Sequence, residues 1–86
     1  MKAMRVAQYG DPSVLQMQDI PKPQPGPGEA LVRVHAAGVN YADIYFRNGA
    51  ARMPIPFPFT PGVEGSGTVE AVGEGVTEVK PGDRVA

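Results

Sequence analysis

The sequence of 86 residues contains no cysteine, no tryptophan and only one histidine. Without cysteine it can form no disulfide framework, thiolate nucleophile, thiol redox pair or cysteine-based zinc site. A single histidine leaves little for metal binding. These absences exclude the small disulfide-stapled domains and the cysteine-dependent enzymes.

Charge of one sign and long apolar runs are also scarce. Eight Lys and Arg residues stand against nine Asp and Glu, for a net charge of −1, and neither sign is clustered. This balance gives no electrostatic footprint for nucleic acid or an anionic membrane. The N-terminal residues lead into polar Gln8 rather than into the apolar region of a signal peptide. We therefore expect a cytoplasmic protein without nucleic-acid or membrane partners.

Valine, glycine and proline dominate what is present. Val outnumbers Leu by 11 to 2, and β-branched residues favour strands. The 11 Gly and 10 Pro residues indicate many turns, while a hydrophobic content of 42% argues against disorder. The composition predicts one small β-rich domain.

The pattern along the chain predicts strands over residues 3–9, 15–20, 29–39 and 65–73, with a further strand beginning at Arg84. Prolines at alternate positions over 21–27 and 54–58 predict extended segments outside the sheets. In strand 29–39, His35 shares a face with Arg33, which indicates a solvated or edge position rather than a ligand or base.

Residues 40–49 predict a helix of two turns. Asn40 is a good N-cap, Asp43 follows three positions later, Arg47 lies in the last turn and Gly49 is a stop signal. Two interpretations of this cluster remain open. Asn40 and Asp43 can serve only as caps while Tyr45 packs by its ring, or Asn40 and Tyr45 can donate hydrogen bonds to a substrate carbonyl.

Two sequence motifs are absent, one that binds dinucleotides and one that carries the serine nucleophile of acyl-transfer enzymes. No window satisfies the dinucleotide fingerprint G-x-G-x-x-G, and Ser66 lacks the flanking glycines of a nucleophile elbow. The glycines are best interpreted as turn and bulge residues.

Ordered blocks of sequence nevertheless resemble the N-terminal catalytic domain of the medium-chain dehydrogenase/reductase superfamily. The blocks are AGVNYAD (37–43), RNG (47–49), PGVEGSG (61–67), VGEGV (72–76) and GDRV (82–85). The resemblance implies a mainly β fold, a GroES-like, partly open β-barrel with one short helix. It also implies that residues 1–86 are this N-terminal domain, truncated at its C-terminal end, and that the cofactor-binding Rossmann domain is absent from this chain.

Two positions depart from the zinc enzymes of the superfamily. Asn40 stands where they carry a cysteine ligand and Val63 where they carry a histidine ligand. An amide is a poor zinc ligand and valine is none, so we expect no metal site. With Tyr45, this pattern resembles the zinc-free quinone oxidoreductases, the zeta-crystallin-like branch.

That branch implies an NADPH-dependent reduction of a quinone, with NADPH held mainly by the missing domain. Asn40 and Tyr45 would lie beside the nicotinamide and the quinone carbonyls, and Asp43 would hold the site's geometry. The full-length protein would be a homodimer and the isolated 86-residue segment inactive. Two alternatives remain: another zinc-free reductase acting on enones or alkenals, to which the small Ala51 points, and a non-enzymatic GroES-like interaction module.

Overall fold

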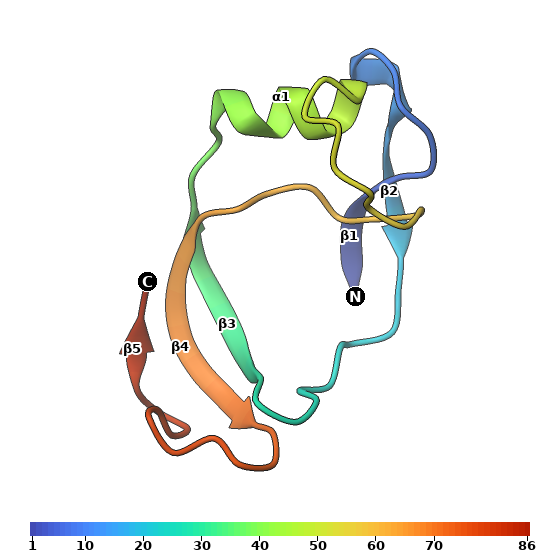
Figure 1. Cartoon of the computed structure of the whole chain (residues 1–86). Coiled ribbons are helices and arrows are strands. Elements are labelled where there is room, and N and C mark those ends of the chain that lie inside the picture. The colour runs from blue at the N-terminus through green and yellow to red at the C-terminus, as the bar shows by residue number, and fades with distance from the viewer. The chain divides into compact units, whose positions relative to one another are not determined.

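The computed structural model describes all residues, 1–86, and is mainly β with one short α-helix (Figure 1). This confirms the predicted fold class. The elements in chain order are β1 (Lys2–Val6), the 3-10 helix η1 (Pro12–Val14), β2 (Leu15–Asp19), β3 (Ala30–Ala37), α1 (Tyr41–Asn48), β4 (Gly65–Val72) and β5 (Arg84–Val85). At eight residues, α1 is too short and too polar to cross a bilayer.

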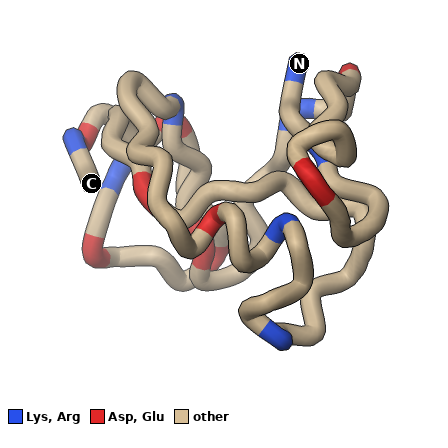
Figure 2. The backbone as a smooth tube through the Cα atoms, turned by 90° about the horizontal axis from the view of Figure 1, so that it is seen from above, with Lys and Arg blue, Asp and Glu red and all other residues tan.

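The strands form two antiparallel sheets and not a closed barrel. β1 pairs with β2, and β3, β4 and β5 lie side by side in that order (Figure 1). The chain divides into two compact units. Unit 1 comprises Met1–Pro21 and Val39–Val63, and unit 2 comprises Lys22–Gly38 and Glu64–Ala86. Basic and acidic positions are interspersed along the chain (Figure 2).

Unit 1 is built on the β1–β2 pair and on α1. Val6, at the end of β1, is fully buried, and its backbone exchanges two hydrogen bonds with Phe59, of 2.8 and 3.0 Å. This single bridge ties the second proline-rich segment to β1. Because Pro54, Pro56 and Pro58 have no N–H group, the segment cannot form a full strand.

Unit 2 is the three-stranded sheet with its connections. β3 and β4 pair from Ala30 opposite Val72 to Ala37 opposite Gly65, with two register irregularities. Val69 of β4 is only 2% exposed. A Cβ on Gly67 would lie 2.0 Å from the carbonyl oxygen of Arg33, so glycine is required where β3 approaches β4.

The predicted strand over 3–9 is wrong beyond Val6. Residues 7–9 leave the sheet because Gly10 is held at the end of α1, where its N–H donates to the carbonyl of Arg47 at 3.1 Å. The Tyr9 ring then packs edge-on against Phe57, with ring centres 4.9 Å apart. The other predicted strands and the helix agree with the structure to within two residues at each end.

Candidate functional site

The first turn of α1 holds two of the three predicted site residues in one hydrogen-bonded arrangement. Asn40 is the N-cap, with the extended backbone (φ −123°, ψ 158°) that this position requires. The Asp43 carboxylate turns back and accepts a hydrogen bond from the Asn40 backbone N–H at 2.9 Å. The cap therefore fixes the backbone from which the Asn40 side chain extends.

The last turn of α1 is tied to the loop after β1. Arg47 donates from Nε to the Gly10 carbonyl at 3.2 Å, and Gly49 ends the helix in the left-handed conformation (φ 85°). A cation in the last turn also suits the negative end of the helix dipole. Both ends of this short helix are thus fixed within unit 1.

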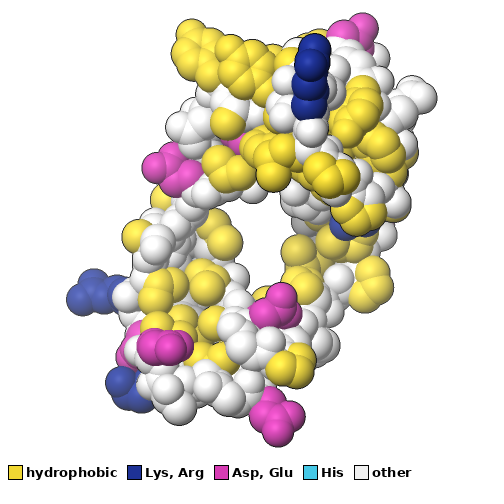
Figure 3. Space-filling view, viewed as in Figure 1, with side chains coloured by type: hydrophobic (Ala, Val, Ile, Leu, Met, Phe, Trp, Pro, Cys, Tyr) yellow, Lys and Arg dark blue, Asp and Glu magenta, His cyan; other side chains and the backbone are white.

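The helix turns apolar side chains outward. Tyr41, Ile44 and Tyr45 share one face by their spacing and are 80%, 37% and 51% exposed. Hydrophobic side chains accordingly cover much of the surface where α1 lies (Figure 3). The half-buried helix residues are Ala42, Asp43, Phe46 and Arg47. Exposed apolar patches occur at binding sites, so this face is a candidate binding surface.

Tyr45 presents a hydroxyl that forms no hydrogen bond within the chain. Its backbone carbonyl accepts from the N–H of Ala51 at 3.2 Å, which holds the residue while the ring stays half exposed. The phenol is therefore a free donor on a fixed helix. Half of the residue is covered, so the packing role and the donor role of Tyr45 both stay predictions.

The environment of Asp43 differs from that of the other two predicted site residues, Asn40 and Tyr45. One carboxylate oxygen, Oδ2, caps Asn40, and the other, Oδ1, is buried without a hydrogen-bond partner. Asn40 is exposed and has an interaction of its own. The structure thus joins Asn40 to Asp43, whereas Tyr45 forms no hydrogen bond with either residue.

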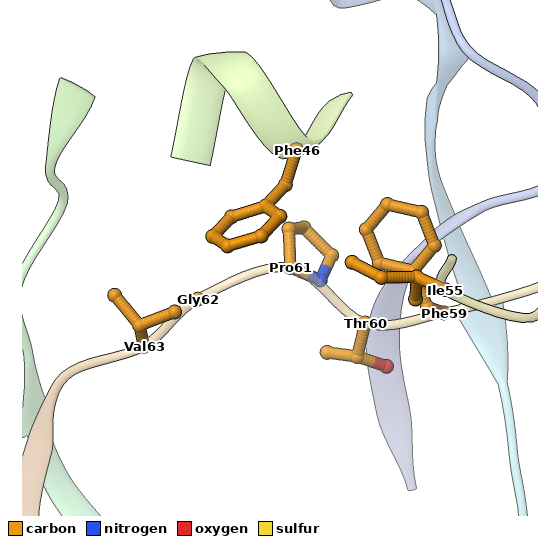
Figure 4. Close-up of a pocket in the computed structure, with 7 residues that line it drawn as sticks. All are labelled: Phe46, Ile55, Phe59, Thr60, Pro61, Gly62 and Val63. Atoms are coloured by element: carbon orange, nitrogen blue, oxygen red, sulfur yellow. The ribbon is translucent and has the colours of Figure 1, made fainter. Parts of the chain in front are cut away.

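An apolar cavity of about 140 Å³ lies beside α1 in unit 1. In Figure 4 the Phe46 ring points from the helix toward Pro61, with Ile55 and Phe59 on the other side of that proline. Its lining residues are Phe46, Ile55, Phe59, Thr60, Pro61, Gly62 and Val63. Sequence analysis missed this cavity, although the alternation of Ile55, Phe57 and Phe59 with prolines was the available signal.

Residues 26–86 match the family model described as the alcohol dehydrogenase GroES-like domain. The chain belongs to this family. The GroES-like chain is 46% identical over 86 residues to the quinone oxidoreductase of Sus scrofa, an alignment that covers 99% of the chain and 26% of that relative. It spans about a quarter of the length of the curated relatives that it matches.

Solved structures of two kinds share this GroES-like fold. Escherichia coli quinone oxidoreductase complexed with NADPH has a TM-score of 0.88 and 34% identity, covering 98% of this chain and 26% of that one. A thermostable alcohol dehydrogenase from Pyrobaculum aerophilum, with cobalt and zinc bound, has a TM-score of 0.86 and 42% identity, covering 98% and 25%. The fold is therefore shared by zinc and quinone enzymes, and individual residues must distinguish them.

The chain has few side chains that could bind a metal ion. No group of three His, Cys, Asp or Glu side chains is placed to hold a metal ion. Position 40 carries an amide and position 63 a valine, which is 61% exposed and lines the cavity. Neither side chain is a competent zinc ligand.

Proposed function

We propose that this chain is the N-terminal part of an NADPH-dependent quinone oxidoreductase that works without zinc. The identity to quinone oxidoreductases over nearly the whole chain supports this proposal. The single observation that carries it is the Tyr45 hydroxyl, which has no hydrogen-bond partner within the chain and belongs to a half-exposed residue of the short helix that Asn40 caps. The rest of the protein would supply a Rossmann domain.

The chain's own residues suit the reduction of a carbonyl-conjugated ring. NADPH, held mainly by residues outside this chain, would supply a hydride to an electron-poor acceptor. Hydrogen-bond donors from this chain would stabilise the negative charge that develops on the acceptor's carbonyl oxygen. Tyr45 offers its phenolic O–H and Asn40 its amide N–H₂. Asn40 at the N-cap of α1 and Tyr45 within α1 are both exposed, which supports their assignment as donors to a bound ring.

Zinc is not needed in this proposal. In a zinc enzyme the metal polarises the substrate oxygen as a Lewis acid. Here Asn40 and Val63 provide no ligand pair, whereas Tyr45 and Asn40 provide donors for the same oxygen. Asp43 acts as a positioning residue, because its carboxylate contacts the Asn40 backbone and its free oxygen is buried away from the acceptor.

The decisive experiment is a reductase assay on the full-length protein, with NADPH and 1,4-benzoquinone in the presence of a chelator. We expect activity to survive chelation and kcat to fall about 100-fold in Tyr45→Phe, since a donor to the developing oxyanion is lost. Tyr41→Phe is the matched control, because it removes a hydroxyl from the same exposed face and should leave kcat unchanged.

Equal rates in wild type and Tyr45→Phe would overturn the site assignment. Loss of activity on chelation would overturn the zinc-free mechanism.

A second candidate is a zinc-free reductase of enones or alkenals. The observation in its favour is Ala51, a small half-buried residue that directly follows the loop from α1. The same assay with an enone in place of the quinone separates the two candidates. A kcat/KM for the enone that exceeds the quinone value would favour this alternative, and no turnover of either would favour a non-enzymatic module.

A further inference from the structure

Two arginines and a threonine form a row across the sheet of unit 2. Thr68 of β4 lies opposite Arg33 of β3 on one side and opposite Arg84 of β5 on the other. Directly opposed residues of antiparallel strands present their side chains on the same face. The spacing between neighbouring strands places the Cα atoms of the two arginines about 10 Å apart, with the Thr68 hydroxyl between them.

His35 joins this row through an irregularity of β3. The register shifts between Val34 and Ala36, so His35 has no directly opposed partner. Its Nε2 lies 3.2 Å from the Thr68 hydroxyl oxygen. The prediction that His35 is solvated agrees with its exposure, but the contact with Thr68 also places it beside both arginines.

The two arginines of the row differ from most cations of the chain in having no partner. Lys2, Lys22 and Lys80 form ion pairs, and Arg5 and Arg47 bond to backbone carbonyls. Arg33, Arg52 and Arg84 form neither kind of contact. Two of these three unpaired guanidinium groups therefore flank a single hydroxyl.

The acidic side chains close to the row in sequence are already engaged in ion pairs. Glu70, two residues beyond Thr68 on β4, is paired with Lys22. Asp83, next to Arg84, is paired with Lys80 at 3.0 Å. The row therefore carries a local positive charge although the whole chain carries −1.

We propose that Arg33, Arg84, Thr68 and His35 bind a phosphate group on the face of β3–β4–β5 that carries their side chains. Guanidinium groups bind tetrahedral oxyanions through paired N–H donors. The Thr68 hydroxyl and the neutral His35 imidazole together add one donor, because the bond between them uses the other proton. A chain of net negative charge has no general attraction for anions, so binding depends on this local cluster. The site lies outside the reductase machinery of α1 and does not depend on the proposed activity.

The test is a titration of the full chain, labelled with ¹⁵N, with inorganic phosphate at constant ionic strength, followed by NMR of the backbone amides. We expect saturable shifts at residues 33, 35, 68 and 84. Arg33→Gln and Arg84→Gln should each weaken binding about tenfold, the usual effect of losing one charged hydrogen bond. Thr68→Val should weaken it less, because the hydroxyl is a neutral donor.

Arg52→Gln is the matched control, since it removes an equally unpaired arginine elsewhere in the chain and should leave the affinity unchanged. A second arm replaces phosphate with glycerol 3-phosphate. Tighter binding of the ester would assign the site to phosphorylated small molecules, and equal binding would assign it to free phosphate. Linear shifts without saturation, equal shifts with chloride, or an equal loss in Arg52→Gln would overturn the proposal.

Discussion

The Asp43 carboxylate accepts a hydrogen bond from the backbone N–H of Asn40 at 2.9 Å, and this contact links helix formation to the position of a predicted donor. A free backbone N–H at a helix start has no intrahelical partner, so the carboxylate satisfies it. The other carboxylate oxygen is buried and unpaired. Both observations support the prediction that Asp43 holds the geometry of the site.

Asp43→Ala should lower the free energy of unfolding by about 1 kcal/mol, the usual cost of a lost helix cap. Asp43→Asn should cost less, because its amide oxygen can still accept from the Asn40 N–H. Urea unfolding followed by circular dichroism measures both. If Asp43 positions Asn40 for the proposed reductase activity, the alanine variant of the full-length protein should also lose kcat with little change in KM, and the asparagine variant should recover most of it. An alanine variant with full stability and full kcat would contradict this role.

Gly67→Ala should be among the most damaging small substitutions in unit 2. The new Cβ would lie 2.0 Å from the Arg33 carbonyl oxygen, a backbone atom that cannot move without separating β3 from β4. Overpacking of this kind costs about 1–3 kcal/mol or more. Thermal unfolding of the purified chain measures the loss.

Gly75→Ala is the control for Gly67→Ala. Nothing lies within 4 Å of a Cβ at Gly75, so only its positive φ of 82° resists the change, at a cost of about 1 kcal/mol. Equal losses in the two variants would show that steric approach of the strands is unimportant.

Arg5 holds the second proline-rich segment against β1. Its guanidinium donates to the Thr60 hydroxyl at 3.3 Å and to the Pro58 carbonyl at 3.2 Å, while its Nε is buried without a partner. Arg5→Met keeps the packing volume but removes both bonds, and should cost about 1–2 kcal/mol of stability. Thr60→Val removes one bond and should cost less than half of that. A neutral Arg5→Met would show that relief of the unpaired Nε offsets both lost bonds.

Asp83 should contribute stability at neutral pH that disappears in acid. Hydrogen bonds from the Lys80 side chain and backbone N–H hold the pKa of the Asp83 carboxyl below its usual 3.8. A lowered folded-state pKa stabilises the fold above the unfolded value, and this stabilisation is lost as the pH falls through the folded value. The Tm of the wild type should therefore exceed that of Asp83→Asn by a constant amount near neutral pH. This difference should disappear as the pH falls below 3.8.

Lys80→Met is the matched variant for the acid experiment. Without the ammonium group the pKa of Asp83 should return toward 3.8, and the Tm difference caused by Asp83→Asn should shrink at neutral pH. A Tm difference that persists unchanged in acid would contradict the role of the charge.

Local signals made the helix predictable, and long-range contacts made other features unpredictable. Asn40, Asp43, Arg47 and Gly49 each act within a few residues of one another, so spacing alone located α1. The position of Tyr9 depends on Phe57, which is far along the chain, and the strand over 3–9 was therefore overextended. The free hydroxyl of Tyr45 required the structure, since no pattern of residues distinguishes an outward from a packed ring.

The same limit applies to the row on unit 2. Sequence placed Arg33 and His35 on one strand, but the register of β4 and β5 is what brings Thr68 and Arg84 to them. Strand register is set by pairing across long stretches of chain, and a bulge such as the one at His35 cannot be inferred from alternation.

The alternation of the two units along the chain bears on how the protein is made. All residues of unit 1 are present once Val63 has been synthesised. Strand β3 of unit 2 has no strand to pair with until β4 (Gly65–Val72) has also been synthesised. During that interval both edges of β3 lack hydrogen-bond partners, which is the state most prone to pairing with another chain. Synthesis of Gly65–Val72 closes one of these edges, so β3 depends on a strand that follows it by nearly thirty residues for its only hydrogen-bonded neighbour.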